Sequence, residues 1–237
     1  MTGAALNELI TSVNGNEEIE ITLANSLVKI GKTILEGERD WAPLKKTDTS
    51  ISFSQGTIWT TAYSLNAITD FLRFQSCEYP VKVFDGNNQV EYYRQVPWEK
   101  RLHYKDTNNT FVYDEANNRI YFNGVHTLGG TVYLEYIKDT PEIDLTAVTD
   151  LKTNGSFPFP SRYHDILAFY AVGISKGAID YDEINKQMLP ANQATLVSLK
   201  SAMVRWDSEK QTTEVAMTDP YRGGSNDFRS GHINIHD

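Results

Sequence analysis

The sequence contains a single cysteine, Cys77, among 237 residues. An intramolecular disulfide and a cysteine-based zinc site are therefore excluded. No apolar run approaches the roughly 20 residues that a membrane-spanning helix needs. The first residues, Met1–Ala5, show neither the basic nor the apolar region of a signal peptide. We therefore expect a soluble protein that is made in a reducing compartment and does not engage a membrane.

Basic residues are also few, with 22 Lys and Arg against 31 Asp and Glu, a net charge of −9. Proteins that grip nucleic acid over a wide surface neutralise phosphates with clustered cations, so this charge argues against such a role. A like-charged wall repels a polyanion and lets it pass without sticking. The composition is thus compatible with a protein along which nucleic acid moves without being bound.

Both ends of the chain, apart from the last residues, carry helical patterns. Leu23, Leu27, Ile30 and Ile34 recur at helical spacing and predict a helix that starts after Asn16 and ends at Gly37. Towards the C-terminus, Ser161 is expected to cap one helix. Pro190 lies inside a further helical region that starts near Asp180, so we expect either a kink there or a break with Pro190 at the first position of a new helix. The last helix carries a predicted buried stripe and extends to about Gln211; the stripe is Leu196, Leu199, Met203 and Trp206.

The segment between the two helical parts has the pattern of short β-strands. Apolar and polar residues alternate in 50–54, 119–122 and 131–137, and turn signals such as Asn108-Asn109 separate the runs. No helical crossovers lie between them, so we expect an antiparallel arrangement. The predicted fold class is α+β: a bundle of N- and C-terminal helices (1–40 with 150–211), an inserted antiparallel β-rich domain (41–149) and an extended C-terminal arm (212–237).

The predicted arm combines flexible glycine-rich stretches with regularly placed apolar, aromatic and basic residues. One interpretation is a disordered terminus. The other is an arm that becomes ordered on a partner. The residues expected to anchor it there are Tyr221, Arg222, Phe228, Arg229, Ile233 and Ile235.

Residues that could carry chemistry form no strong pattern, and no catalytic residue, cofactor or metal site is predicted. No GxGxxG, P-loop, GxSxG or HExxH motif occurs in the sequence. Four groups carry little weight as chemical sites. They are His232 and His236 as metal ligands, His164 with Asp165 as a general base and its orienting carboxylate, Asp114 and Glu115 as the two carboxylates of a glycosidase, and Cys77 as a nucleophile.

Several stretches together resemble the head-to-tail adaptor, or connector, proteins of tailed bacteriophages, including the tail tubular type. These stretches are Asp40-Trp41, the aromatic strand Thr131–Tyr136, the segment Phe157–Ala171 with its Pro-Phe-Pro-Ser-Arg-Tyr sequence, and a last helix that contains Trp206. The resemblance covers roughly Leu6–Gln211.

This resemblance implies a structural virion protein at the head–tail junction, assembled in the host cytoplasm. Such proteins form a ring, often dodecameric, under the portal protein. DNA passes through the centre without specific binding, and a downstream tail or neck protein follows. The resemblance places the portal-binding surface in the residues after Gln211, and it implies no enzymatic activity.

Two other interpretations remain open at this point. One is another ring component of the tail or neck, such as a tail terminator or a baseplate piece. The other is a β-module that binds host glycans through Tyr92, Tyr93 and Trp98, since aromatic side chains stack on sugars.

Overall fold

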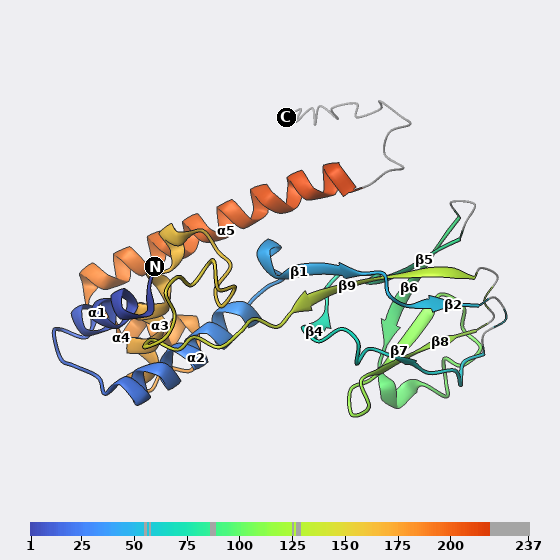
Figure 1. Cartoon of the computed structure of the whole chain (residues 1–237), viewed down its shortest axis with the longest axis horizontal. Coiled ribbons are helices and arrows are strands. Elements are labelled where there is room, and N and C mark those ends of the chain that lie inside the picture. The colour runs from blue at the N-terminus through green and yellow to red at the C-terminus, as the bar shows by residue number, and fades with distance from the viewer. Residues whose placement is uncertain (55, 57, 86–88, 125, 127–128, 219–237) are drawn as a thin grey trace, which may run out of the picture.

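The computed structural model describes residues 1–54, 56, 58–85, 89–124, 126 and 129–218. The molecule is elongated, with the helices gathered at one end and most strands at the other (Figure 1). Strands β1 (Lys45–Asp48) and β9 (Gly130–Lys138) pair with each other and lead from the helical end into the sheet.

The described residues form five α-helices, which are α1 (Gly3–Val13), α2 (Ile21–Gly37), α3 (Ile166–Ser175), α4 (Tyr181–Gln187) and α5 (Pro190–Thr218). Helix α3 lies at the centre, since it contacts each of the other four. Eight of its ten residues are buried, which fits a helix that is apolar on every side. A short 3₁₀ turn, η3 (Ser161–Tyr163), precedes it, so Ser161 does not cap α3 directly.

Two glycines allow the helices to approach α3 closely. A Cβ atom on Gly31 of α2 would lie 2.8 Å from Cβ of Tyr170, and one on Gly173 of α3 would lie 2.7 Å from Cγ2 of Ile184. Both separations are shorter than a carbon–carbon contact allows. The lack of a side chain at these two positions therefore sets the spacing of α2 and α4 against α3.

Within the described part of the chain, the strands form one nine-stranded mixed sheet whose order is β1-β9-β5-β6-β7-β8-β3, with β2 and β4 also paired to β9. The remaining strands are β2 (Ser52–Phe53), β3 (Tyr63–Ser64), β4 (Phe71–Phe74), β5 (Val81–Phe84), β6 (Val90–Val96), β7 (Thr110–Asp114) and β8 (Arg119–Asn123). β9 carries β1 and β2 along one edge and β4 and β5 along the other. The sheet curls into a half-barrel.

Each end of the molecule has its own hydrophobic core. The helical core gathers residues of all five helices together with Trp41, Phe157 and Phe159. The sheet core lies within the curl and is lined by residues such as Val83, Phe111, Phe122 and Leu134. Trp41 is fully buried beside Phe159, and its indole N–H donates to the Leu35 carbonyl at 2.7 Å.

The fold class predicted from the sequence is wrong. The structure has a large, curled, mixed sheet in place of a helical bundle with an inserted antiparallel domain. The decisive difference is that β6 and β7 pair in parallel, with Arg94 opposite Thr110. Residues 97–109 form the crossover, which includes the 3₁₀ turn η2 (Trp98–Lys100), and parallel pairing needs a connection of about this length.

The expected boundary of the extended arm is also different. Pro190 begins helix α5 and does not kink a longer helix, which is one of the two expected outcomes; α5 continues to Thr218, so residues 212–218 are helical. Proline suits the first helical position because its missing N–H has no intrahelical acceptor there. The rest of the predicted arm, residues 219–237, lies outside the described residues.

Candidate functional site

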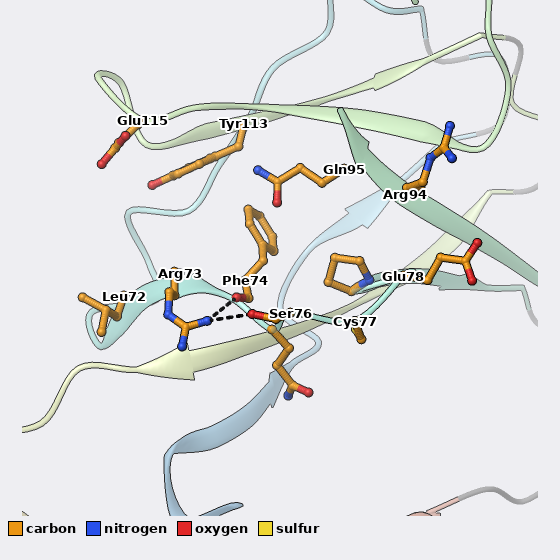
Figure 2. A pocket seen from close by; sticks show the side chains of 12 residues that line it. Leu72, Arg73, Phe74, Ser76, Cys77, Glu78, Arg94, Gln95, Tyr113 and Glu115 are labelled. Carbon is orange, nitrogen blue, oxygen red and sulfur yellow. Dashed lines mark hydrogen bonds between the residues drawn. The ribbon is translucent and has the colours of Figure 1, made fainter. Parts of the chain in front are cut away.

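A hollow of about 490 Å³ lies at the sheet end, between the β4–β5 connection and strands β6 and β7. Figure 2 shows Gln95 pointing towards Phe74 at its centre, whereas the side chains of Arg94 and Glu78 point away to one side. The Arg73 guanidinium at its floor donates to the Ser76 hydroxyl at 3.3 Å. The lining groups therefore hold one another or face solvent, and they do not converge on a common point.

The pair of carboxylates considered for a glycosidase lies at the turn between β7 and β8. Asp114 is buried and accepts hydrogen bonds from the backbone N–H and the side-chain amide of Asn117, at 3.3 and 2.8 Å. Glu115 is exposed at the rim of the hollow. Asp114 thus stabilises the turn, an ordinary role for aspartate.

Cys77, which also lines the hollow, lies with its sulfur 3.9 Å from Oε2 of Glu135. Partial burial and the Glu135 carboxylate raise the pKa of the Cys77 thiol. Because the thiolate is the nucleophilic form, this environment disfavours nucleophilic chemistry.

His164 is buried in the helical core. Its Nε2 lies 2.9 Å from the Phe159 carbonyl oxygen, and its ring packs against Phe157. Burial lowers the pKa of His164, so its neutral form is favoured. The described hydrogen bonds do not join it to Asp165, and the residue belongs to the core rather than to a base with an orienting carboxylate.

The three aromatic residues considered for glycan binding do not form one platform. Tyr92 is exposed and stacks edge-on with Tyr79, whereas Tyr93 points into the sheet core. The Tyr93 hydroxyl donates to Glu91 at 2.5 Å. Trp98 lies within the crossover and packs against Tyr121 and Arg101, and Tyr93 is buried, so the three rings do not present one common face to a sugar chain.

The other residues singled out in the sequence lie outside the described part of the chain. These are the histidines His232 and His236 and the expected anchors Tyr221, Arg222, Phe228, Arg229, Ile233 and Ile235.

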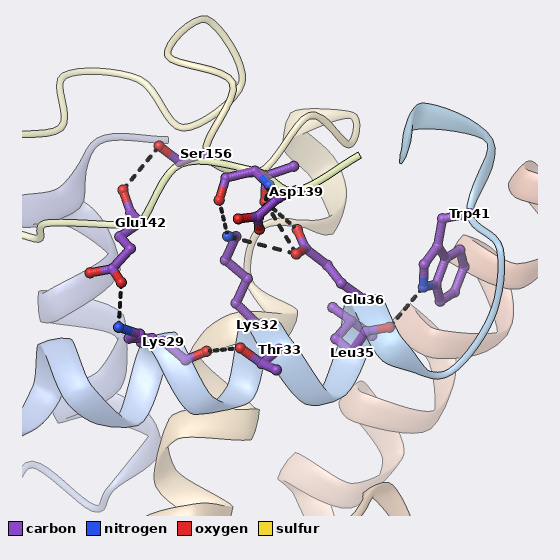
Figure 3. Close-up of polar contacts among 10 residues, drawn as sticks. Lys29, Lys32, Thr33, Leu35, Glu36, Trp41, Asp139, Glu142 and Ser156 are labelled. Carbon is purple, nitrogen blue, oxygen red and sulfur yellow. Dashed lines mark hydrogen bonds and ion pairs between the residues drawn. The ribbon is translucent and has the colours of Figure 1, made fainter. Parts of the chain in front are cut away.

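A buried polar group, which the sequence patterns do not reveal, fastens α2 to the segment that follows β9 (Figure 3). Nζ of Lys32 donates to the Thr140 carbonyl at 2.9 Å and lies 3.6 Å from Glu36. The Thr140 hydroxyl donates to the Glu36 carboxylate at 3.0 Å. Burial raises the pKa of Glu36 to about 7. Near the surface, Lys29 pairs with Glu142.

A second polar group fixes α5 to the segment that leads from α2 into β1. Asp207 of α5 is fully buried and accepts from the Ala42 N–H at 2.6 Å, from Arg39 at 2.9 Å and from Gln211 at 2.7 Å. Gln211 also donates to the Asp40 carbonyl at 2.9 Å. We call these five residues the α5 clasp.

The clasp connects to its surroundings on two sides. The Asp40 carboxylate accepts from Arg73 of β4 at 2.7 Å. About two turns before Asp207, Lys200 pairs with Glu38 and lies 5.4 Å from the centre of the Trp41 ring. Burial lowers the pKa of Lys200 to about 7. The helical end and the sheet are therefore linked by charged contacts as well as by β1 and β9.

The outer face of β6, β7 and β8 carries a small separate cluster that consists of Val96, Val112 and Tyr121. The crossover covers it through Arg101, whose guanidinium lies 4.0 Å from the centre of the Tyr121 ring. The rings of Trp98 and Trp59 flank the same guanidinium at 4.9 and 5.1 Å.

We use the name cap patch for Trp59, Trp98 and Arg101 of this stack together with the exposed apolar residues next to them in the sequence, Ile58 and Leu102. The sequence shows Trp98 as one of several aromatics, but the stacking of Trp59 on Arg101 depends on a contact between residues 42 positions apart. Cation–π stacking of this kind fixes the orientation of large side chains at a surface.

Comparison with known proteins adds no family assignment. No protein-family model matches the chain, and no curated protein matches it. Among the described residues, no three His, Cys, Asp or Glu side chains gather as a metal ion would require. Over the same residues, no helix combines the length and apolar character needed to cross a membrane.

Proposed function

We propose that the chain is a structural virion protein that forms a ring between the head portal and the tail of a bacteriophage. By resemblance, the ring contains about twelve copies, and DNA passes through its centre. The residues that support this proposal are those that resemble connector proteins, above all the aromatic strand within β9 and the Pro-Phe-Pro segment before α3.

The observation that carries the proposal is the elongated molecule with a separate hydrophobic core at each end (Figure 1). A ring subunit must contact its neighbours and at the same time meet one partner above and another below. Two cores that are joined by paired strands and the α5 clasp present separate rigid surfaces for such contacts. The candidate side chains around the hollow, by contrast, do not converge as catalytic groups must.

The charge of the chain fits a passage for DNA. A net charge of −9 per copy accumulates around a ring, and a negative wall repels the phosphate backbone. Retention of the DNA by the wall would require clustered cations. The proposal therefore needs no specific contact between this chain and DNA.

Helix α5 supplies a way to reach a partner beyond the ring. Its 29 residues span about 43 Å, and its last turns project past the helical core (Figure 1). The residues that follow carry the anchors proposed for portal binding, namely Tyr221, Arg222, Phe228, Arg229, Ile233 and Ile235. Segments that fold on a partner use apolar anchors of this kind.

The proposal is tested by native mass spectrometry of the protein from its natural source. We expect a multi-copy complex that contains a second ring-forming protein, with a stoichiometry near twelve. A single chain that carries a bound sugar, or that turns over a substrate, would contradict the proposal.

A truncated chain that lacks residues 219–237 tests the portal contact separately. This deletion leaves α5 and its clasp in place. We expect the truncated protein to keep its fold, measured by circular dichroism, and to lose attachment to the portal. If attachment survives, the arm does not dock on the portal, and another ring of the tail or neck, such as a tail terminator, becomes the better assignment.

A further inference from the structure

The cap patch is unusual because large apolar side chains remain in solvent beside aromatic rings that are stacked on Arg101. Exposed fractions are 60% for Ile58, 38% for Trp98 and 71% for Leu102. Trp and Arg are the residues most enriched at the energetic centres of protein interfaces. Since the Arg101 stack fixes the rings before any contact is made, little conformational entropy is lost on binding.

The charges beside the cap patch are more basic than the chain as a whole. Lys100, Arg101 and Lys105 lie in the crossover, together with the acids Glu99 and Asp106. Lys100 and Lys105 are both exposed. The surface therefore carries a small excess of positive charge in a protein whose net charge is −9.

The opposite end of the molecule carries an apolar surface with the reverse charge. On α2, Leu23 and Ile30 are 51% and 47% exposed. They are seven residues apart and therefore lie on the same side of the helix. The exposed carboxylates Glu17, Glu18 and Glu20 immediately precede α2. We call these five residues the α2 patch.

No cation offsets these carboxylates within the same stretch of sequence. Residues 1–28 contain four glutamates and neither lysine nor arginine. Leu23 and Ile30 are left exposed because α2 turns its other side, with Ala24, Leu27 and Gly31, towards the core.

We propose that the cap patch of one copy docks on the α2 patch of the next copy. Each patch has an apolar centre and the two have opposite charge, which is the complementarity that steers and orders protein contacts. Because the two patches lie at opposite ends of one chain, the contact is head-to-tail, and repeated contacts of this type close a ring when the rotation between copies allows it. This inference rests on the proposed function, since it names the surfaces that join the ring.

Zero-length carbodiimide cross-linking of the assembled protein tests the contact directly. We expect cross-links that join Lys100 or Lys105 to Glu17, Glu18 or Glu20. Within one copy the crossover and the start of α2 lie at opposite ends, so such a cross-link must join two copies. The proposal is wrong if the copies assemble but every cross-link joins other residues. It is also wrong if the protein forms no contact with itself, either in concentrated solution or in its natural assembly.

Charge reversal provides the second test. Lys100→Glu with Lys105→Glu, or Glu17→Lys with Glu18→Lys, places like charges across the contact. We expect either pair to weaken self-association by at least about tenfold in sedimentation velocity experiments, because like-charge juxtaposition is costly. In an equimolar mixture, contacts have opposite charges wherever the two variants alternate, and we expect the mixture to recover association in alternating order.

A matched control separates this contact from general charge repulsion. Lys186→Glu with Lys210→Glu changes the net charge as Lys100→Glu with Lys105→Glu does, and both of these lysines are exposed and belong to neither patch. The control is expected to associate normally. If the control weakens association equally, or if the mixture fails to recover, the proposed contact is wrong.

Failure of this inference is distinguishable from failure of the proposed function. If the natural complex contains about twelve copies and the charge-reversal variants still assemble, the proposed ring stands and only the proposed contact is refuted. If the protein is isolated from its natural source as a single chain, the proposed ring function itself is refuted.

Discussion

Replacement of Asp207 by alanine tests whether the α5 clasp holds the helical end together. The substitution removes the acceptor for the buried Ala42 N–H, for Arg39 and for Gln211. An unsatisfied buried donor costs about 1–3 kcal/mol. The Arg39 side chain is about one-third exposed, so its lost ion pair adds little. We therefore expect Asp207→Ala to lower the free energy of unfolding by roughly 3 kcal/mol.

Asp207→Asn distinguishes the hydrogen bonds from the charge. An amide oxygen still accepts from the Ala42 N–H, so we expect a loss of only about 1 kcal/mol. Urea unfolding should be followed by helix content and by tryptophan fluorescence, because two cores can unfold in separate steps. Glu8→Ala, which removes an exposed carboxylate on α1, is the control and should change little. If the alanine and asparagine variants were equally stable, the reasoning from the buried donor would be refuted.

Three further outcomes are expected. Burial raises the pKa of Glu36 from 4.5 to about 7, so the folded state holds this proton more tightly than the unfolded state does. Stability measured by urea unfolding should then fall by roughly 3 kcal/mol as the pH rises from 4.5 to 7, and Glu36→Gln should flatten this dependence. Gly31→Ala should destabilise the protein by about 1–3 kcal/mol in thermal unfolding because its Cβ meets Tyr170, whereas Gly37→Ala, with open space around it, should not. Arg101→Ala should weaken the near-ultraviolet circular dichroism of the stacked rings and cost about 1–2 kcal/mol.

Local patterns in the sequence located several elements well. Pro190 marks the first residue of α5 and Gly37 the last residue of α2, because proline and glycine act on the backbone next to them. Alternation in 119–122 and 131–137 found β8 and β9. The start of α2 was misplaced, since Asn16 adopts a left-handed conformation in the turn after α1, and Glu20 caps the helix instead.

The parallel pairing of β6 and β7 could not be predicted in the same way. Asn109 does have the positive φ that its type favours, but it lies at the end of a crossover rather than within a hairpin. The reason is tertiary: the outer face of these strands presents Val96 and Val112, and the crossover buries them. A turn residue predicts that the chain changes direction, but it does not predict which strand the following segment pairs with.

The polar groups escaped prediction for a related reason. Asp207 and Ala42 are 165 positions apart, and Lys32 and Thr140 are 108 apart, so no spacing in the sequence joins them. Each charged residue also lies among others that are exposed, as on most helices. Burial alone makes Asp207 different, because a buried carboxylate must be hydrogen-bonded or paired. Since its three partners come from the connection into β1 and from α5 itself, the role of Asp207 exists only once these two segments have packed together.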